Sequence, residues 1–212
     1  MQTYEIAIYP GDGIGPEVID QAIRVLEIVQ AQVGGFGLNM THLPWGADYY
    51  AETGRVAPPD FLDVLRSFDA ILLGALGAPD RIPDHITLEP LVRTRQTFNQ
   101  YACVRPARLF PGVRSPLAVE GASEVDLVVV RENSEGEYVY CGGRFKVGEP
   151  EEFALQTAVH TRRGIERILR FGFELAMTRR QHLTLITKSN AQRYGFVLWD
   201  EILEEAGESG LP

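Results

Sequence analysis

The sequence predicts an α/β fold with a mostly parallel sheet, and three observations support this prediction. Apolar strand candidates alternate with helical segments along most of the 212 residues, as in a sheet whose strands are joined by crossover helices. Residues 69–77, DAILLGALG, form a continuous apolar run that is typical of a parallel strand buried on both faces. Residues 161–180 carry their apolar side chains on one stripe and form the clearest amphipathic helix of the chain.

The other strands follow from local patterns. YEIAIYP and LNMTHL predict two strands before the apolar run, and YACVRPARLF and VDLVVVREN predict two more after it. In EYVYCGGRFKV, alternating residues flank Cys-Gly-Gly, so we expect a hairpin that turns at those three residues. HLTLIT predicts a last strand.

Helices are expected between these strands. One runs from Pro16 to about Gln32, because Pro16 suits a first helical turn and the apolar residues after it repeat every three to four positions. Those repeating residues are Val18, Ala22, Val25 and Val29. Shorter helices are expected in PPDFLDVLRSF and DHITLEPLVRTRQTF, and a final one from about Ala191 to Ala206. In the helix at 161–180 the stripe consists of Ile165, Ile168, Leu169, Gly172, Leu175 and Ala176.

Composition narrows the class of protein. The length suits one sizeable domain or two small ones, and 45% hydrophobic with 23% charged residues is ordinary for a folded globular chain. The formal net charge of -9 argues against nucleic acid as a partner. Cys103 and Cys141 lie far apart without zinc-ligand spacing, which favours a reducing compartment. We find no basic leader and no apolar run of membrane-spanning length, so we expect a cytoplasmic protein without a membrane partner.

The glycine-rich stretch IAIYPGDGIGPEVID can be compared with the dinucleotide-binding fingerprint. Gly11 and Gly13 match the first two glycines of Gly-x-Gly-x-x-Gly, but Pro16 occupies the third position. The next predicted strand contains no acidic residue that could hold a ribose. The stretch does not match the phosphate-binding loop motif either, because no Gly-Lys-Ser/Thr follows. We therefore interpret the stretch as a tight turn that leads from a strand into a helix.

Three arginines are candidates for binding a carboxylate substrate. Arg95 lies on a predicted helix, Arg105 in the Cys-Val-Arg-Pro strand, and Arg131 at the end of DLVVVRE. Strand ends of this kind are where open α/β sheets bind ligands. Guanidinium groups match carboxylates with two hydrogen bonds, so three converging arginines would suit a di- or tricarboxylate. Each could instead be a solvated surface charge, an alternative that fits Arg131 least.

Five segments together resemble the β-decarboxylating dehydrogenases of the isocitrate, isopropylmalate, homoisocitrate, tartrate and D-malate group. They are YPGDGIGPEV, DAILLGALGAP, RQTFNQYACVRP, VVVRENSEGEY and ITKSNAQR, in the order and spacing of that family. The resemblance implies a two-domain isocitrate/isopropylmalate dehydrogenase-like fold, not a standard Rossmann fold. Residues 1–99 would begin the large cofactor-side domain, and residues 100–212 would form a second, dimer-forming domain with a hairpin arm, both incomplete.

The resemblance also assigns roles to individual residues. It implies that three arginines hold the substrate, that a tyrosine and a lysine are catalytic, and that three residues contact the cofactor. Because the family's Lys-x-Asn segment reaches into the partner's site, it implies a homodimer. The substrate residues are Arg95, Arg105 and Arg131; the catalytic residues are Tyr138 and Lys188; the cofactor residues are Ile14, Thr87 and Asn190.

The implied reaction is a metal-dependent, NAD-linked oxidative decarboxylation of a malate-type 2-hydroxy acid. A hydride passes from C2 to NAD while Mg²⁺ or Mn²⁺ polarises the hydroxyl oxygen. Lys188 would accept the hydroxyl proton, which requires a lowered pKa, and Tyr138 would protonate the enolate carbon left by loss of the β-carboxylate. No metal ligand is expected within this sequence.

The branch of the family is indicated by two segments. RENSEGEY, with Asn133 after Glu132, resembles the isocitrate, tartrate and D-malate branches, whereas isopropylmalate enzymes usually carry Leu there. PDHITLEPL resembles the tartrate and D-malate branch, although Glu89 and Pro90 depart from its pattern. Tartrate or D-malate is therefore favoured, and isocitrate and isopropylmalate stay open as substrates.

Members of the family are considerably longer than this sequence. The metal-binding aspartates and the adenosine-binding segment are expected in a missing C-terminal part, so the chain as written is expected to be an inactive, poorly soluble fragment. A non-catalytic relative that binds a carboxylate or an intact paralogue is an alternative. A free-standing nucleotide-binding module is another, and it would bind NAD by itself.

Overall fold

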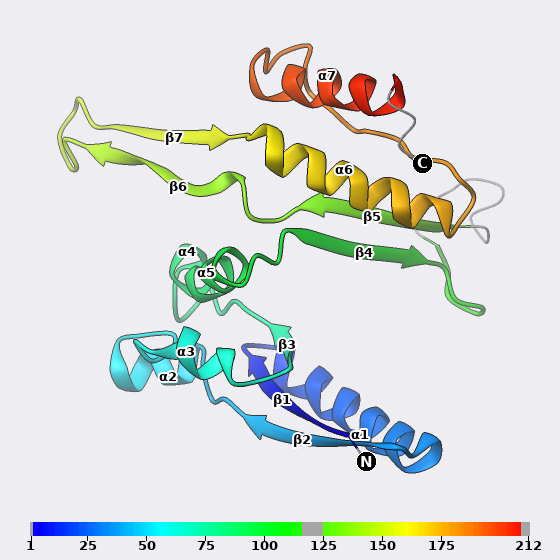
Figure 1. The fold of residues 1–212 in the computed structure, drawn as a ribbon. Helices are drawn as coiled ribbons and strands as arrows, with labels where there is room; N and C mark the ends of the chain where they lie inside the picture. The colour runs from blue at the N-terminus through cyan, green and yellow to red at the C-terminus, as the bar shows by residue number, and fades with distance from the viewer. Residues whose placement is uncertain (1, 116–124, 209–212) are drawn as a thin grey trace. The chain divides into compact units, whose positions relative to one another are not determined.

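The computed structural model describes residues 2–115 and 125–208, which form two compact units, Met1–Thr97 and Phe98–Pro212 (Figure 1). Each unit has its own strands and helices and is described by itself. The α/β class expected from the sequence is confirmed, and the parallel sheet lies in the first unit.

The sheet of the first unit consists of three parallel strands in the order β2-β1-β3. They are β1 (Gln2–Gly11), β2 (Phe36–His42) and β3 (Ala70–Ala75). The central strand β1 has Ala7, Ile8 and Tyr9 buried in succession, so both of its faces are covered. Burial of a side chain such as Ile8 stabilises the fold by about 1.5–3 kcal/mol, which makes β1 the centre of this core.

Helices cover the sheet of the first unit. The long helix α1 (Gly15–Val33) packs against β1 and β3. Trp45 lies edge-on to the ring of Tyr9, with centroids 5.4 Å apart, and to Phe61 of α3 (Phe61–Arg66). The short helix α2 (Ala47–Thr53) was not expected from the sequence, and it starts a small core of Ala47, Val56 and Ile82.

The helix predicted from Pro16 is confirmed, but it does not bury the residues whose spacing indicated it. Val18, Val25 and Val29 are exposed, whereas Gly15 and Ile19 are buried. The reason is that α1 is apolar on two neighbouring stripes, and within the described residues only one of them faces the sheet.

Two further predictions in this unit need correction. DAILLGALG forms a parallel strand as predicted, but β3 is half-buried rather than buried on both faces, because within the described residues it pairs with β1 on one edge only. DHITLEPLVRTRQTF forms two helices, α4 (Asp84–Thr87) and α5 (Glu89–Thr97), instead of one. Pro90 lacks a backbone N–H and fits only a first turn, so a new helix begins just before it.

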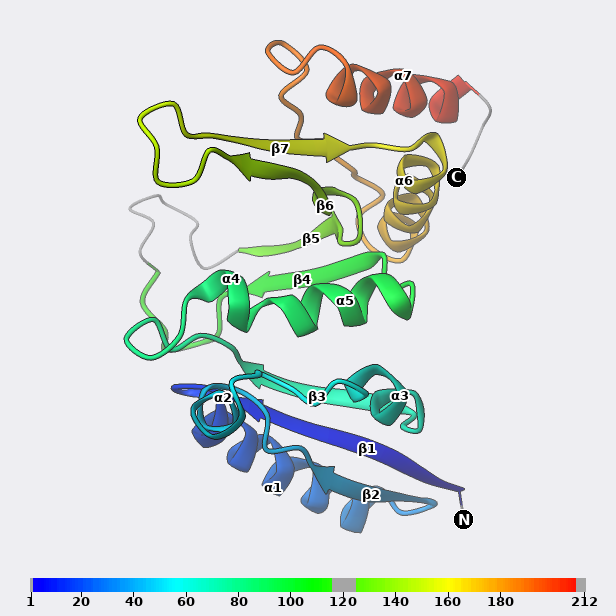
Figure 2. The same cartoon turned by 90° about the vertical axis from the view of Figure 1, so that its left-hand side faces the viewer.

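In its described residues, the second unit contains two antiparallel strand pairs and two helices, which Figure 2 shows from a second side. Strand β4 (Ala102–Arg108) pairs with β5 (Asp126–Glu132), and β6 (Gly136–Phe145) pairs with β7 (Phe153–Val159). Helix α6 (Arg162–Met177) packs against β5, and α7 (Gly195–Glu208) packs on α6. The predicted stripe of α6 is confirmed, since Ile165 and Leu169 form a core with Ile202 of α7.

The hairpin expected around Cys141 exists, but its turn was placed wrongly. Cys141, Gly142 and Gly143 lie inside β6 and pair with β7, and the turn falls between Phe145 and Phe153. A Cβ at Gly142 would overlap the carbonyl oxygen of Leu155. The glycine therefore permits close approach of two strands rather than a reversal of the chain.

The strand predicted for HLTLIT is wrong in the described structure. Residues 182–188 have no regular secondary structure. A strand needs a neighbour that accepts and donates backbone hydrogen bonds, and the described residues provide none for this segment. The last helix begins at Gly195, four residues later than Ala191.

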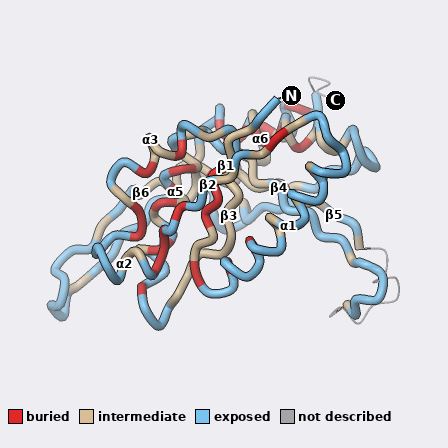
Figure 3. Tube along the Cα trace, turned by 90° about the horizontal axis from the view of Figure 1, so that it is seen from below, coloured by how far each residue is buried: buried red, intermediate tan, exposed pale blue. Residues whose placement is uncertain are grey.

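Buried positions gather on β1 and on one side of α6 (Figure 3). Among residues 2–115 and 125–208, no helix combines the length and hydropathy needed to cross a membrane.

Candidate active site

The strongest candidate site lies where β5 ends and the chain turns into β6. Arg131 is the second-last residue of β5, and its Nη1 donates to the hydroxyl of Tyr138 on β6 at 3.0 Å. Its guanidinium carbon also lies 5.3 Å from the centre of the Tyr138 ring, within the range of a cation–π contact. The structure therefore brings together two residues that the sequence singled out.

Arg105 lies on the same face of the strand pair as Arg131. The antiparallel register places Cys103 directly opposite Arg131, and Arg105 follows two residues after Cys103. Opposite residues of an antiparallel pair, and residues two apart on one strand, share a face. Nε of Arg105 donates to Sγ of Cys103 at 3.3 Å, and this bond, aided by Tyr138, raises the pKa of Arg105. The charge of Arg105 is thus favoured on the face that also carries Arg131.

The turn between β5 and β6 is held by Glu132, whose side chain is 7% exposed. Its carboxylate accepts hydrogen bonds from the backbone N–H groups of Ser134 and Glu135, at 2.8 and 2.6 Å. It also forms an ion pair with Arg167 of α6, at 3.1 Å. Since a buried carboxylate requires such partners, this short acidic, polar segment folds into one turn anchored on α6.

Glu135 fixes the same turn to the start of α6. Its carboxylate accepts from the backbone N–H of Thr161 at 2.9 Å and from the Thr161 hydroxyl at 2.7 Å. Thr161 is the N-cap residue of α6, and its Oγ1 accepts from the N–H of Gly164. A Cβ at Gly164 would overlap the Glu135 carboxylate, so a larger residue there would displace that carboxylate from Thr161.

The other predicted site residues of the second unit lie at the turn before α7. Lys188 and Asn190 are exposed, and the carbonyl oxygen of Lys188 accepts from the N–H groups of Ala191 and Gln192. The Arg131–Tyr138 contact is formed without them.

The remaining predicted site residues belong to the first unit. Arg95 is half-buried in the last turn of α5. Thr87 is fully buried at the end of α4, with its hydroxyl 3.4 Å from the carbonyl oxygen of Pro83. Ile14 is 63% exposed at the start of α1. Their roles toward substrate and cofactor stay predictions.

The glycine loop between β1 and α1 is the tight turn expected from the sequence. Asp12 is buried there, and its carboxylate accepts from the N–H groups of Ala47 and Gly77, at 2.6 and 3.1 Å. The N–H of Gly15 is bonded to the carbonyl oxygen of Asp12. The N–H groups of Asp12 and Gly15, two donors of this loop, are thus used by the protein itself.

A resident divalent cation does not fit the part of the chain that is described. Residues 2–115 and 125–208 contain no group of three or more His, Cys, Asp or Glu side chains that could hold a metal ion. Glu132 and Glu135 are near the site, but their oxygens are engaged by Ser134, Thr161 and Arg167.

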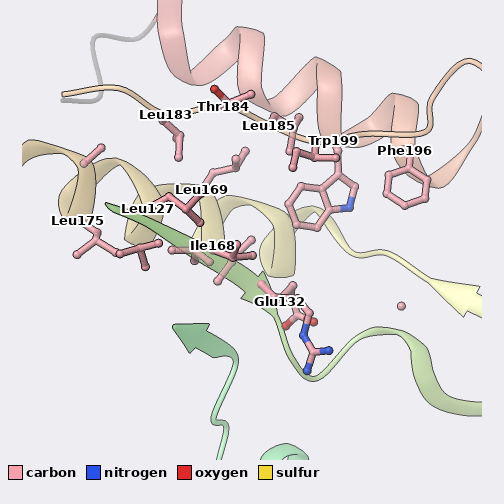
Figure 4. A pocket seen from close by; sticks show the side chains of 18 of the residues that line it. Leu127, Glu132, Ile168, Leu169, Leu175, Leu183, Thr184, Leu185, Phe196 and Trp199 are labelled. Atoms are coloured by element: carbon pink, nitrogen blue, oxygen red, sulfur yellow. The ribbon is translucent and has the colours of Figure 1, made fainter. Parts of the chain in front are cut away.

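A largely apolar pocket of about 720 Å³ adjoins the site within the second unit (Figure 4). All residues of 127–132 line it, which indicates that an edge of β5 borders the pocket, and α6 forms another wall. Leu183 and Leu185 lie above, and Leu185 is next to Trp199 (Figure 4). Arg131 and Tyr138 also line the pocket. It thus offers an apolar space with a polar end.

Two residues of this site were missed by the sequence analysis. Cys103 could have been found, since it precedes Arg105 by two residues in a predicted strand and must share its face. Asn133 had served only as a marker of the family branch, and nothing in the sequence indicated that it accepts a hydrogen bond from Nη2 of Arg131, at 2.6 Å. A position just after a strand end is common for any turn residue and does not indicate contact with an arginine.

The fold and the site define a two-unit α/β protein that carries two arginines and a tyrosine near the end of a strand. More specifically, the chain belongs to the isocitrate/isopropylmalate dehydrogenase family, whose model matches residues 5–212. The family resemblance inferred from the five segments is therefore confirmed.

Named relatives refine this assignment. The chain is 50% identical over 210 residues to a probable tartrate dehydrogenase/decarboxylase of Agrobacterium vitis, covering 98% of this chain and 58% of the relative. It is 47% identical over 212 residues to the decarboxylating D-malate dehydrogenase of Escherichia coli K12, covering 99% and 58%. These relatives confirm the resemblance to the tartrate and D-malate branch.

Solved structures agree on the fold. The isocitrate dehydrogenase from Methylococcus capsulatus superposes with a TM-score of 0.80 at 33% identity, covering 98% of this chain and 57% of that one. The two-domain dehydrogenase fold expected from the sequence is confirmed. The chain spans somewhat more than half the length of the relatives it matches.

Proposed function

We propose that this chain supplies substrate-binding and proton-transfer residues for the NAD-linked oxidative decarboxylation of a malate-type 2-hydroxy acid, with tartrate or D-malate as substrate. The observation that carries the proposal is the contact of Arg131 with Tyr138, with Arg105 on the same face of the neighbouring strand. Isocitrate and isopropylmalate are the alternative substrates. The names of the relatives support the choice of tartrate or D-malate.

The chemistry of the chain's own residues follows from their hydrogen bonds. Arg131 can only donate, so the Tyr138 oxygen accepts in their bond and the phenolic proton is not used in it. Tyr138 would deliver that proton to the carbon that loses its carboxylate. Arg105 and Arg131 would bind substrate carboxylates, with Arg95 as a third arginine supplied by the first unit.

Lys188 is proposed to accept the substrate's hydroxyl proton in the site of a second copy of the chain, with Asn190 beside it at the cofactor. The β6–β7 hairpin supports a homodimer, because it carries exposed apolar side chains. Tyr140, Phe145, Phe153 and Leu155 are 61%, 45%, 50% and 56% exposed. Exposed apolar surface of this kind marks contact sites between proteins.

NAD and Mg²⁺ or Mn²⁺ are proposed as cofactors from family membership. The described residues contain no group of three or more His, Cys, Asp or Glu side chains that could hold the metal. Ile14 and Thr87 remain proposed contacts on the cofactor side. We further propose a cytoplasmic protein in which residues 1–99 belong to the cofactor-side domain and residues 100–212 to the dimer-forming domain.

The proposal is tested on the purified chain by calorimetry and by turnover. We expect D-malate or tartrate to bind, and Arg131→Ala to abolish binding, while NAD reduction with Mn²⁺ is expected to be absent because the described residues form no metal ligand set. Binding that is the same in the parent and in Arg131→Ala would refute the assignment of the site. Ordinary turnover by the 212 residues would refute the expected inactivity.

A second candidate function is a non-catalytic carboxylate-binding relative. The missing metal ligand set among the described residues favours it. It predicts carboxylate binding that Mn²⁺ leaves unchanged in any longer form of the chain, whereas a dehydrogenase site that includes its metal ligands gains affinity for D-malate with Mn²⁺.

A further inference from the structure

Asn133 is almost completely buried beside Arg131, and its side-chain amide is used at both ends. The residue is 5% exposed. Its Oδ1 accepts from Nη2 of Arg131 at 2.6 Å, and its Nδ2 donates to the carbonyl oxygen of Gln100 at 3.2 Å. Its backbone N–H donates to the carbonyl oxygen of Tyr101 at 2.8 Å. Asn133 thereby links the end of β5 to the segment that leads into β4.

The orientation of this amide follows from the chemistry of its partners. A guanidinium can only donate hydrogen bonds, and a backbone carbonyl can only accept them. The amide oxygen of Asn133 must therefore face Arg131, and its nitrogen must face Gln100. The opposite orientation would set two donors and two acceptors against each other, so the arrangement has one solution.

The guanidinium of Arg131 is held at its two ends by neutral groups. Nη2 is bonded to Asn133 and Nη1 to Tyr138, while Nε is buried without a hydrogen-bond partner among the described residues. Neutral partners fix the plane of the guanidinium without cancelling its charge. A carboxylate would therefore meet an arginine that is already oriented, at a lower entropic cost than a mobile side chain imposes.

We propose that Asn133 is a positioning residue, which orients Arg131 for a substrate carboxylate through the bond from Nη2 to Oδ1. This inference rests on the proposed function, because it assigns Arg131 to the substrate. The competing explanation is that Asn133 serves the turn alone, through its bonds to Gln100 and Tyr101.

Nitrogen NMR on the chain with ¹⁵N-labelled arginine separates the two explanations without any substrate. The Arg131 side-chain signals are assigned by their loss in Arg131→Lys. In Asn133→Leu, which has no acceptor, rotation of the guanidinium Nη groups should accelerate by about tenfold or more. Asn133→Asp keeps an acceptor for Arg131 and loses the donor to Gln100, so it should restore slow rotation without restoring the stability of the turn.

Asn39→Leu is the matched control, since Asn39 is exposed on β2 and bonded to Glu5. It should leave the Arg131 signals unchanged. If the circular dichroism of Asn133→Leu departs from the parent, Asn133→Ala is measured with the same expectation. Equal rotation rates in the parent and the apolar variants would overturn the proposal, as would rotation in Asn133→Asp as fast as in Asn133→Leu. Loss of native structure in both the Leu and Ala variants would also overturn it, because Asn133 would then serve folding alone.

A second arm measures D-malate affinity by calorimetry, and Asn133→Leu should weaken it by about tenfold. If the parent binds no D-malate, the proposed function fails, and the NMR arm still decides the role of Asn133.

Discussion

Arg131 and Tyr138 are seven residues apart in sequence and touch through a hydrogen bond of 3.0 Å, because the turn between them reverses the chain. The turn owes its shape to Glu132, which accepts two backbone N–H groups and pairs with Arg167. A buried carboxylate thus places a cation and a phenol side by side, and it does so through hydrogen bonds to the backbone between them.

Arg131→Lys should weaken D-malate binding by about 10- to 100-fold. Lysine keeps the charge but loses the fork that bonds two oxygens at once, and it cannot hold Asn133 and Tyr138 together. Isothermal calorimetry measures the change. Arg144→Lys is the control, because Arg144 lies on β6 and pairs with Glu152 of the hairpin. A lysine variant with the affinity of the parent would contradict the assignment of Arg131.

Methylthiolation of Cys103 should reduce D-malate affinity. Sγ of Cys103 accepts from Nε of Arg105 and stands opposite Arg131, so an added group would displace the arginine. The reaction is followed by mass spectrometry in a Cys141→Ser background, since Cys141 is exposed. D-malate should slow the labelling, and Cys103→Ser should resist the loss of affinity. Labelling at Cys103 that leaves affinity intact would count against the shared face.

Glu132→Gln should lower the free energy of unfolding of the second unit by about 3–5 kcal/mol, because Arg167 would keep a partly buried charge without its counter-ion. Glu205→Gln is the control. Its partner Arg162 is exposed at 48%, so loss of this ion pair should change the free energy of unfolding much less. Urea unfolding followed by circular dichroism measures both. Equal effects of the two substitutions would contradict the anchoring role of Glu132.

Tyr9→Phe should remove a pH dependence of stability above pH 10. Burial, and secondarily the charge of Asp12, raise the pKa of Tyr9 above its usual value of 10.0. Below pH 10 the phenol is neutral in both states. Above it the unfolded phenol ionises first, so the free energy of unfolding falls by about 1.4 kcal/mol per pH unit. Urea titrations between pH 9 and about 11.5 compare the parent with Tyr9→Phe.

The Tyr9 hydroxyl has no hydrogen-bond partner among the described residues, so at pH 7 the Phe variant should be as stable as the parent or more stable. Tyr194→Phe is the control, because Tyr194 is 86% exposed. It should leave the alkaline slope in place. A slope that survives in Tyr9→Phe would assign the effect to other groups.

Sequence patterns were sufficient where one local signal determined one structure. The run at 69–77 indicated β3, and the stripe through Ile165 and Leu169 indicated α6, because strand and helix periodicities differ clearly. They were insufficient where a partner decides the outcome. Gly142 looked like a turn residue but serves the approach of β7, and HLTLIT has a strand pattern without a neighbouring strand in the described residues.

In the candidate site, too, local motifs predicted some residues, whereas others depend on partners distant in sequence. Family motifs indicated Arg131 and Tyr138, and the structure places them in contact. Asn133 and Cys103 act through contacts that depend on strand register and on the shape of one turn. Register is set by which strands pair, and that information is distributed over the whole of β4 and β5 rather than written at either residue.

The carbonyl oxygen of Pro10 is approached from two sides, since a Cβ at either Gly15 or Gly74 would overlap it. Gly15 belongs to α1 and Gly74 to β3, yet both are restricted by the same carbonyl oxygen. A second substitution therefore cannot rescue the first, and a library randomised at both positions should retain glycine at each even under selection for folding alone. Used as a search pattern, PGDGIGPEV would then retrieve proteins by how their backbones pack, and a match would carry no information about which nucleotide they use.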